Sequence, residues 1–100
     1  MWGAAMSDQL TLASTVQWSG DQIAATVDRE IVILSVERGS YYGLDEIGSE
    51  IWQQLVNPIR VGALCDALTA NYDADRGTIE RDVLVLLNSL AAEGLIQVAA

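Results

Sequence analysis

The hydrophobic pattern of this chain changes its period near Leu44. Before this residue, short apolar runs rich in Val, Ile and Thr are separated by turn signals such as Gly20-Asp21, which indicates strands and hairpins. After it, apolar residues recur every three or four positions, which is typical of amphipathic helices. The order predicts an α+β fold with the sheet first and the helices second. For 100 residues we expect a single domain over residues 15–98, preceded by a flexible N-terminal segment over residues 1–14.

The first half predicts a three-stranded antiparallel meander. Strands are expected at Gln22–Val27, Glu30–Val36 and Ser40–Leu44, and Thr15–Ser19 is a candidate for a further short strand. The run Ile31–Val36 is apolar on both faces, which is typical of a strand that is covered on both sides or lies centrally in its sheet. Gly39 can take the positive φ that the turn before the last strand needs. The last strand is expected at one edge of the sheet.

The second half predicts three helices. Asp45 can cap the first of them, because its carboxylate can accept the free N–H groups of the first turn. Gly94 is a fitting residue just beyond the end of the last one. The segments expected in order are a helix from Asp45 to Asn57-Pro58, a helix from about Val61 to Tyr72, a polar loop over Asp73–Gly77, a helix from about Thr78 to Glu93, and a terminal stretch over Leu95–Val98 that either forms a short strand or packs onto the core.

The third helix is more apolar than one core contact requires. At roughly 100° per residue, one stripe contains Ile79, Val83, Leu86, Leu87 and Leu90, and Leu84 widens it on one flank, whereas Val85 points well away from it. Residues 83–87 are five consecutive apolar residues in the sequence, which places apolar side chains on more than one face of the helix. Either this helix lies centrally and touches both other helices and the sheet, or one or two of these residues face a groove for a partner.

The residue inventory argues against catalysis and against metal binding. The chain has no His and a single cysteine, Cys65, so a zinc site and an internal disulfide are not expected. No Ser has a His or Lys to activate it, and no Gly-rich phosphate-binding loop occurs. Asp45-Glu46 and Asp73-Ala74-Asp75 are interpreted as helix-start and turn residues rather than as paired acid–base groups. We expect a binding module that is not an enzyme and carries no cofactor.

The net charge of the chain limits the classes of partner that it can bind. Fourteen Asp and Glu stand against five Arg and no Lys, which gives a net charge of −9. Nucleic-acid binding needs clustered cations, so it is not expected here, and neutral or basic partners are favoured. There is no apolar run long enough to span a membrane and no signal-peptide pattern, and the single cysteine fits a reducing compartment. The expected location is the cytoplasm.

The strand Ser40–Leu44 has an unusual edge. Edge strands are normally protected by charge, Pro or a covering element, and this one contains neither charge nor Pro. Gly43 permits close approach of another backbone. The strand can therefore accept an extended peptide as an added strand. The alternative is an ordinary short strand whose two tyrosines pack on the core and whose edge is covered by the N-terminal segment.

Three segments in this order resemble the PqqD-like family. They are the strings Gly39–Leu55 (GSYYGLDEIGSEIWQQL), Glu80–Val83 (ERDV) and Gly94–Ile96 (GLI), and the resemblance extends over about Thr15–Val98. Members of this family are recognition elements that bind the leader peptides of ribosomally made natural products. Within the family, the chain is most similar to the stand-alone form found in lasso-peptide gene clusters.

The resemblance implies a winged-helix-like fold in which three helices follow a three-stranded sheet. It implies that a leader peptide adds to the third strand and lies against the third helix, with an aromatic leader residue in an apolar pocket near Val36, Tyr42 and Leu86. The peptide-binding residues implied in this way are Val36, Ser40, Tyr41, Tyr42, Gly43, Leu44, Asp82, Val83, Val85, Leu86 and Ser89. For Asp82, a local pair with Arg81 or Arg38 remains an equal alternative.

The same resemblance implies the partners of the chain. These are the precursor leader peptide, a leader peptidase of the transglutaminase-like cysteine protease type, and a macrolactam cyclase, and the chain itself is expected to be a monomer or a strand-exchanged dimer. A pyrroloquinoline-quinone-type or radical-SAM-associated peptide carrier is the alternative within the family. A winged-helix DNA-binding protein is less favoured, because the third helix offers Arg81 against Glu80, Asp82 and Glu93.

Overall fold

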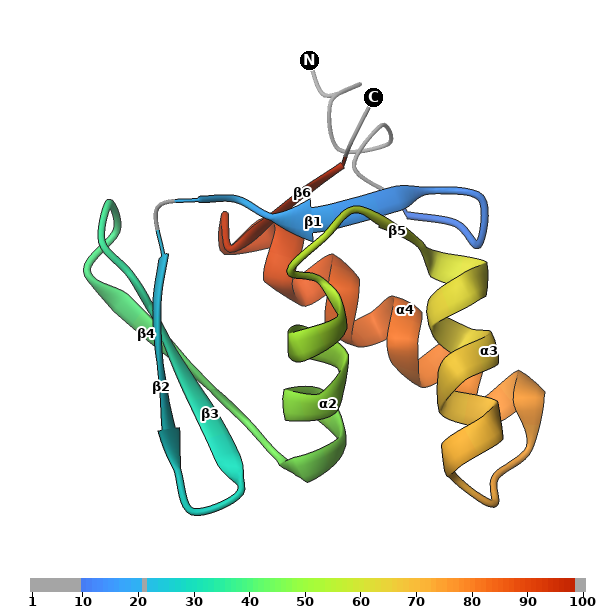
Figure 1. The fold of residues 1–100 in the computed structure, drawn as a ribbon. Helices are drawn as coiled ribbons and strands as arrows, with labels where there is room; N and C mark the ends of the chain where they lie inside the picture. Colours follow the sequence, from blue (N-terminus) through green and yellow to red (C-terminus); the bar gives the residue numbers. More distant parts are fainter. Residues whose placement is uncertain (1–9, 21, 99–100) are drawn as a thin grey trace.

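The computed structural model describes residues 10–20 and 22–98. These residues form two three-stranded sheets and three helices, with α2 beside one sheet and the second sheet across the top of the helices (Figure 1). The elements in chain order are β1 (Thr15–Trp18), β2 (Gln22–Val27), β3 (Glu30–Ser35), β4 (Ser40–Leu44), α2 (Glu46–Gln54), β5 (Ile59–Arg60), α3 (Val61–Asn71), α4 (Arg76–Ala92) and β6 (Ile96–Val98). The expected α+β class, with an antiparallel three-stranded sheet followed by three helices, is confirmed.

The strands β2, β3 and β4 form the predicted meander, and β4 lies at one edge of it. Both connecting turns use left-handed backbone, at Asp28 (φ 58°) and at Gly39 (φ 68°). The expected strand Glu30–Val36 ends one residue early, because the chain turns after Ser35: the Ser35 carbonyl accepts the N–H of Gly39 at 2.8 Å, which leaves Val36 in the turn.

The structure has a second sheet, formed by the two ends of the domain and β5, which the sequence did not predict. β1 does not join the meander; it pairs antiparallel with β5 on one side and β6 on the other. β5 has only two residues, and the residues that it pairs with in β1 are more than forty positions away in the chain, so no local pattern indicates this strand. The terminal stretch over 95–98 resolves as the strand β6. The turn expected at Gly20-Asp21 has φ 106° at Gly20, and Asp21 lies outside the described residues.

The segment before β1 is placed against the helices where the structure describes it. Leu10 is buried and its N–H donates to Asn88 Oδ1 on α4 at 3.1 Å. The carbonyls of Leu12 and Ser14 accept the N–H groups of Gly62 (2.9 Å) and Val61 (2.8 Å), which cap the start of α3. Residues 1–9 of the segment expected to be flexible lie outside the described residues.

Two of the three helices, α2 and α4, begin at a carboxylate that caps them. Asp45 Oδ1 accepts the N–H of Gly48 at 2.7 Å and starts α2, as predicted. Asp75 caps α4 through the N–H of Thr78 at 3.2 Å, so this helix begins at Arg76, two residues before the expected start. α2 ends at Gln54 and stops short of Asn57-Pro58, because the carbonyl of Leu55 turns away to accept the N–H of Trp18 in β1 at 3.2 Å.

One hydrophobic core connects both sheets to all three helices. Its largest side chain, Trp52 of α2, is 2% exposed and stacks on Trp18 of β1 with ring centroids 5.2 Å apart. Trp18 Nε1 also donates to the Trp52 carbonyl at 2.9 Å, which fastens the second sheet to α2. Burial raises the pKa of the Cys65 thiol, so this residue remains protonated and packs as a small apolar side chain.

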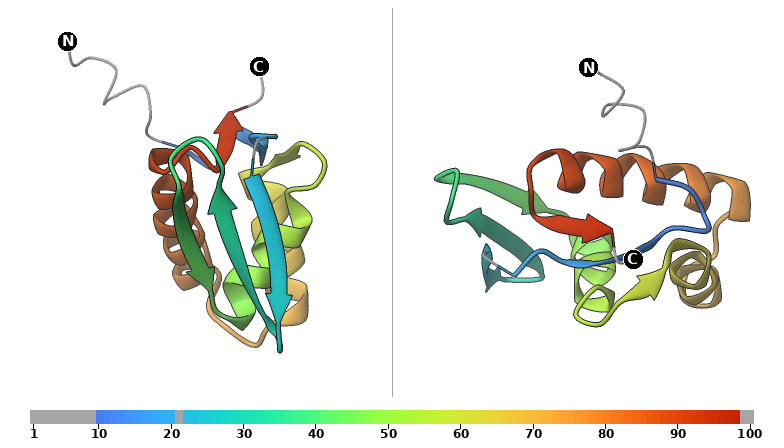
Figure 2. Two further views of the ribbon diagram at one scale, coloured as in Figure 1. Left: turned by 90° about the vertical axis from the view of Figure 1, so that its left-hand side faces the viewer. Right: turned by 90° about the horizontal axis from the view of Figure 1, so that it is seen from above.

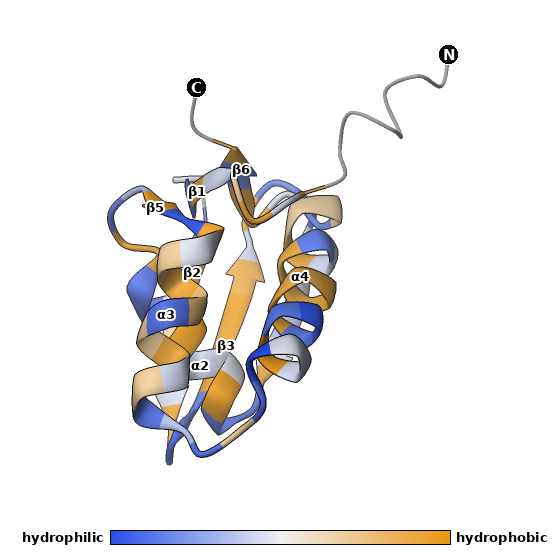
Figure 3. Cartoon of the chain, turned by 90° about the vertical axis from the view of Figure 1, so that its right-hand side faces the viewer, coloured by the Kyte–Doolittle hydropathy of each residue, from blue (hydrophilic) through white to orange (hydrophobic). Residues whose placement is uncertain are grey.

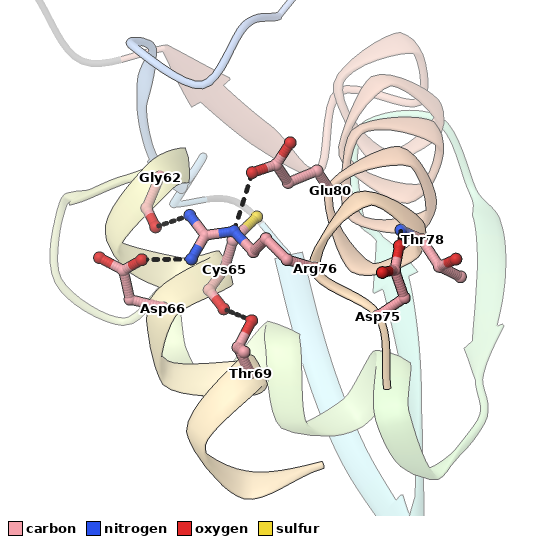
Figure 4. Close-up of polar contacts among 8 residues, drawn as sticks. All are labelled: Gly62, Cys65, Asp66, Thr69, Asp75, Arg76, Thr78 and Glu80. Atoms are coloured by element: carbon pink, nitrogen blue, oxygen red, sulfur yellow. Dashed lines mark hydrogen bonds and ion pairs between the residues drawn. The ribbon is translucent and has the colours of Figure 1, made fainter. Parts of the chain in front are cut away.

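A cluster of polar contacts fixes α4 against α3 (Figure 4). The Arg76 guanidinium pairs with Asp66 of α3 at 2.5 Å and with Glu80 of its own helix at 2.8 Å. It also donates to the Gly62 carbonyl at 3.4 Å. The hydrogen bonds to Asp66 and Glu80 raise the pKa of Arg76 above its usual value, so its charge is constant. The position of α4, which forms one wall of the site below, is set by this cluster and the core.

Candidate functional site

A groove of about 520 Å³ lies between β4 and α4, with α2 at its base. β4 contributes Tyr42, Gly43 and Leu44 to its lining, and α4 contributes Asp82, Val83, Val85, Leu86 and Ser89. These eight residues are all members of the predicted peptide-binding set. The fold therefore brings two segments about forty residues apart in the chain to the two sides of one groove.

The backbone edge of β4 is open beside this groove. β4 pairs with β3 through Ser35↔Ser40, Ile33↔Tyr42 and Ile31↔Leu44, and no other strand of the described chain pairs with it. Residues 10–20 run to the second sheet and to α3, so the N-terminal segment does not cover this edge as far as it is described. A Cβ placed on Gly43 would meet nothing within 4 Å, which leaves room for another chain.

Alternation along β4 divides its side chains between two sides of the sheet. Leu44 is 3% exposed and Tyr42 is half-buried, and both pack toward the helices and the groove. Tyr41, which lies between Ser40 and Tyr42 in the strand, is 78% exposed and faces away from the groove. A strand added at this edge would follow the same alternation, so every second side chain of it would enter the groove.

The run of five apolar residues on α4 is divided between the core and the groove. Val83 and Leu87 are buried in the core, and Leu84 and Leu86 are partly buried against it. Val85 is 63% exposed and lines the groove. The helix is thus central to the core and also presents an apolar wall.

Three predicted residues do not line the groove. Val36 lies in the turn after β3 and is 58% exposed, because β3 ends before it. Tyr41 faces the other side of the sheet, and Ser40 lies at the start of β4 next to the turn. Of the pocket expected near Val36, Tyr42 and Leu86, the structure brings together the last two.

Sequence reasoning missed the part of the lining that comes from α2 and its cap, from α3 and the connection after it, and from the first turn of α4. Ile47 stands at helical spacing with Ile51 and Leu55, which predicts a place in the core, but it is 49% exposed and forms part of the groove. Its position in the first turn, beyond the edge of the sheet, could not be read from periodicity. The other lining residues missed are Asp45, Gly48, Ile51, Leu68, Tyr72, Ala74, Thr78 and Ile79.

The charged residues of the lining are both acidic. Asp45 is engaged as the α2 cap, and Asp82 is exposed and forms no ion pair within the described residues. Arg38, an alternative partner for Asp82, instead donates to the Ala92 carbonyl at the end of α4 at 3.0 Å. The groove lining is therefore mainly apolar, and the charged side chains in it are negative.

The described residues contain no cluster of three or more His, Cys, Asp or Glu that could hold a metal ion. None of the helices in the described ranges is long and apolar enough to cross a membrane. The lining offers carboxylates, hydroxyls and apolar groups, without a nucleophile paired to a base.

Comparisons with known proteins agree with this geometry. The model of the family described as coenzyme PQQ synthesis protein D (PqqD) matches residues 30–96. Two proteins described as PqqA binding proteins, from two strains of Rhodopseudomonas palustris, are 45% and 43% identical over 65 residues. Each match covers 65% of this chain and 62% of the length of those relatives.

Two solved structures have a similar fold. One is described as TbiB1 in complex with the TbiA(beta) leader peptide; it is 38% identical with a TM-score of 0.77, covering 84% of this chain and 98% of that one. The other, described as lasso peptide synthetase B1 complexed with the leader peptide, is 26% identical with a TM-score of 0.73, covering 82% of this chain and 96% of that one.

Proposed function

This chain belongs to the PqqD family, and from that premise we propose that it is a non-catalytic module that binds the leader segment of a ribosomally made precursor peptide. The observation that carries the proposal is the free, uncharged backbone edge of β4 beside an apolar groove. Main-chain hydrogen bonds to β4 supply affinity for any extended chain, and the groove selects among side chains.

The length of the free edge of β4 sets how many backbone hydrogen bonds a leader peptide can form with it. β4 has five residues. About four or five backbone hydrogen bonds, at about 1 kcal/mol net each, would add to one or two buried apolar anchors at about 1.5–3 kcal/mol each. Ordering a flexible peptide opposes this gain. The balance at the upper end of these contributions corresponds to dissociation constants in the micromolar range.

We propose further that the precursor is a lasso peptide. The supporting observations are the similarity to two structures solved with leader peptides and the motif over residues 39–55. In this function the chain presents the bound precursor to a leader peptidase of the transglutaminase-like cysteine protease type and to a macrolactam cyclase. The site comprises the eight groove residues of β4 and α4, together with Ser40 and Tyr41 on the pairing strand; Val36 is a peripheral member.

A second candidate function is that of a peptide carrier in pyrroloquinoline quinone biosynthesis or beside a radical-SAM maturase. The identity of 45% to a PqqA binding protein favours it. The neighbouring genes separate the two: a peptidase and a cyclase support the lasso assignment, and an iron–sulfur maturase supports the carrier. DNA binding has little support, since the net charge is −9 and both charged residues of the groove are acidic.

The test compares two neighbouring tyrosines. In Tyr42→Ala the leader loses a half-buried aromatic contact in the groove, and we expect the dissociation constant of a fluorescein-labelled leader, measured by anisotropy, to rise at least tenfold. Tyr41→Ala is the comparison within the same strand: Tyr41 belongs to the site through its backbone, and its side chain faces away from the groove, so its effect should be smaller than that of Tyr42→Ala. Equal affinities of wild type and Tyr42→Ala, with an unchanged circular dichroism spectrum, would remove the groove from the binding site.

A further inference from the structure

The meander has a second free edge, on the side opposite β4. β2 pairs with β3 over Gln22–Val27 and with no other strand in the part of the chain that the structure describes. The left-hand view of Figure 2 shows β4 beside α4 and β2 at the opposite border of the sheet. Like β4, β2 contains neither a charged residue nor Pro, which are usual protections of an edge strand. The sheet can therefore be extended at β2 as well.

Three residues of β2 direct their backbone groups toward this edge. In an antiparallel pair, the N–H and C=O groups of alternate residues bond the partner strand, and those of the residues between them point away. The N–H of Ile31 in β3 donates to Ser49 Oγ on the β4 side at 2.9 Å, so Thr26, which stands opposite Ile31, is not hydrogen-bonded to it. By alternation, the backbone groups that point toward the free edge are those of Gln22, Ala24 and Thr26.

The side chains of these three residues lie on the helical side of the sheet. They stand opposite Ile31, Ile33 and Ser35 of β3, which are all buried. β3 is apolar along most of its length, so the core anchors the strand on which β2 is built (Figure 3). A strand paired with β2 would continue the alternation of the sheet. Every second side chain of it would therefore point to the helical side, toward α2.

A cleft of about 420 Å³ lies between the end of β2, the turn that follows it and α2. Thr26 lines it from the strand, and Glu46, Glu50 and Gln53 line it from the helix. It is separate from the groove between β4 and α4, since the two linings share one residue, Tyr72. The inward side chains of a strand added at β2 would enter this cleft.

The charged residues of the cleft indicate the chemistry of its occupant. Asp28, Glu46 and Glu50 stand against Arg29, and none of the four takes part in an ion pair within residues 10–20 and 22–98. Basic side chains on an added strand are complementary to such a lining. A second copy of this chain is not, because its own β2 offers no cation and two net charges of −9 would approach each other.

We propose that the free edge of β2 and the cleft beside it bind an extended segment of a partner protein that carries Lys or Arg at every second position. Backbone pairing with β2 holds the segment, and the carboxylates of the cleft select its basic side chains. The inference does not depend on what binds at β4. Strands added at β2 and at β4 would extend the sheet at opposite sides, so they do not compete.

The first test uses the full chain labelled with nitrogen-15 and a blocked synthetic peptide of alternating Lys and Val (KVKVKVK). In an NMR titration, we expect the largest changes in amide chemical shift at residues 22–27 and smaller ones at residues 40–44. A peptide of alternating Glu and Val (EVEVEVE) should bind at least tenfold more weakly. Largest changes at residues 40–44, or equal affinities for the two peptides, overturn the inference.

The contribution of backbone pairing is tested at Ala24. Ala24→Pro removes one N–H group at the free edge and leaves the ladder with β3 in place, because edge strands tolerate Pro at such positions. We expect the dissociation constant of KVKVKVK, measured by fluorescence anisotropy, to rise at least tenfold. Ala24→Ser keeps the N–H group and is the matched control, with an expected change below twofold. Unchanged affinity in a folded Ala24→Pro variant overturns the inference.

The contribution of charge is tested on α2, and it decides the question even if Ala24→Pro does not fold. Glu46→Gln/Glu50→Gln should weaken binding of KVKVKVK at least fivefold at 50 mM KCl. Glu37→Gln/Glu93→Gln removes the same charge outside the cleft and the groove, so its effect should be clearly smaller. Equal losses in the two double variants overturn the inference. A wild-type dimer in sedimentation that Ala24→Pro abolishes assigns the edge to a second copy and overturns it too.

Discussion

At the scale of single residues, one buried hydroxyl connects the groove to the sheet. Ser49 of α2 is 4% exposed; its Oγ accepts the N–H of Ile31 in β3 at 2.9 Å and donates to the carbonyl of Leu44 at the end of β4 at 3.4 Å. This side chain therefore holds α2, the base of the groove, to the two strands that carry its open edge. The spacing of the sequence could not assign this role, because the partners are backbone groups of two strands whose positions depend on the tertiary fold.

Ser49→Ala is expected to destabilise the protein by about 1–3 kcal/mol, because it leaves the buried N–H of Ile31 without its acceptor. The measurement is urea unfolding followed by circular dichroism. Ser89→Ala is the matched control: Ser89 is half-buried on α4 and its side chain makes no hydrogen bond within residues 10–20 and 22–98, so its loss should cost less than about 0.5 kcal/mol. Similar unfolding midpoints for the two variants would contradict this role of Ser49.

At the scale of elements, local patterns predicted most of the fold. The meander and the three helices follow from alternation, from caps at Asp45 and Asp75 and from helical spacing, all of which act within a few residues. The β5–β1–β6 sheet could not be predicted in this way, because its pairings join residues near 16, 59 and 98. The same limit applies to the site: β4 and α4 were assigned to it through a resemblance, whereas Ile47 and Tyr72 enter only through the packing of α2 and α3.

The open edge of β4 makes a prediction about the leader backbone. Along an added strand, the N–H groups of alternate residues point toward β4 and the remaining ones point away. N-methylation removes one donor at a time. Single N-methyl groups along the paired leader segment should therefore weaken binding with a period of two, by at least tenfold at the inward positions and by less than threefold between them.

Competition against the labelled leader, read by anisotropy, measures this pattern. A variant of the leader with the corresponding side chains exchanged for Ala serves as the control, because it leaves every backbone donor in place. A loss that follows the Ala series and shows no period of two would mean that side chains hold the leader without strand pairing at β4.

At the scale of the whole molecule, the net charge of −9 favours the approach of cationic peptides to the groove. The free carboxylate of Asp82 stands at its rim, and no cation of the described lining opposes it. Long-range attraction between exposed charges is screened as ionic strength rises, with a Debye length of about 10 Å at 0.1 M and about 3 Å at 1 M. A cationic leader should therefore lose affinity with salt, whereas the apolar contacts in the groove should not.

We expect a leader variant carrying two added Lys at its ends to bind several-fold more tightly than the parent peptide at 50 mM KCl and about equally at 1 M. Asp82→Asn should reduce this salt dependence while leaving the affinity at 1 M KCl within twofold, because the amide has nearly the same size as the carboxylate. The matched control is Asp73→Asn, which removes one exposed charge outside the groove lining. Asp66 is not suitable as a control, because its carboxylate pairs with Arg76. If Asp73→Asn lowers the salt dependence as much as Asp82→Asn, the overall charge attracts the leader and Asp82 has no local part in it.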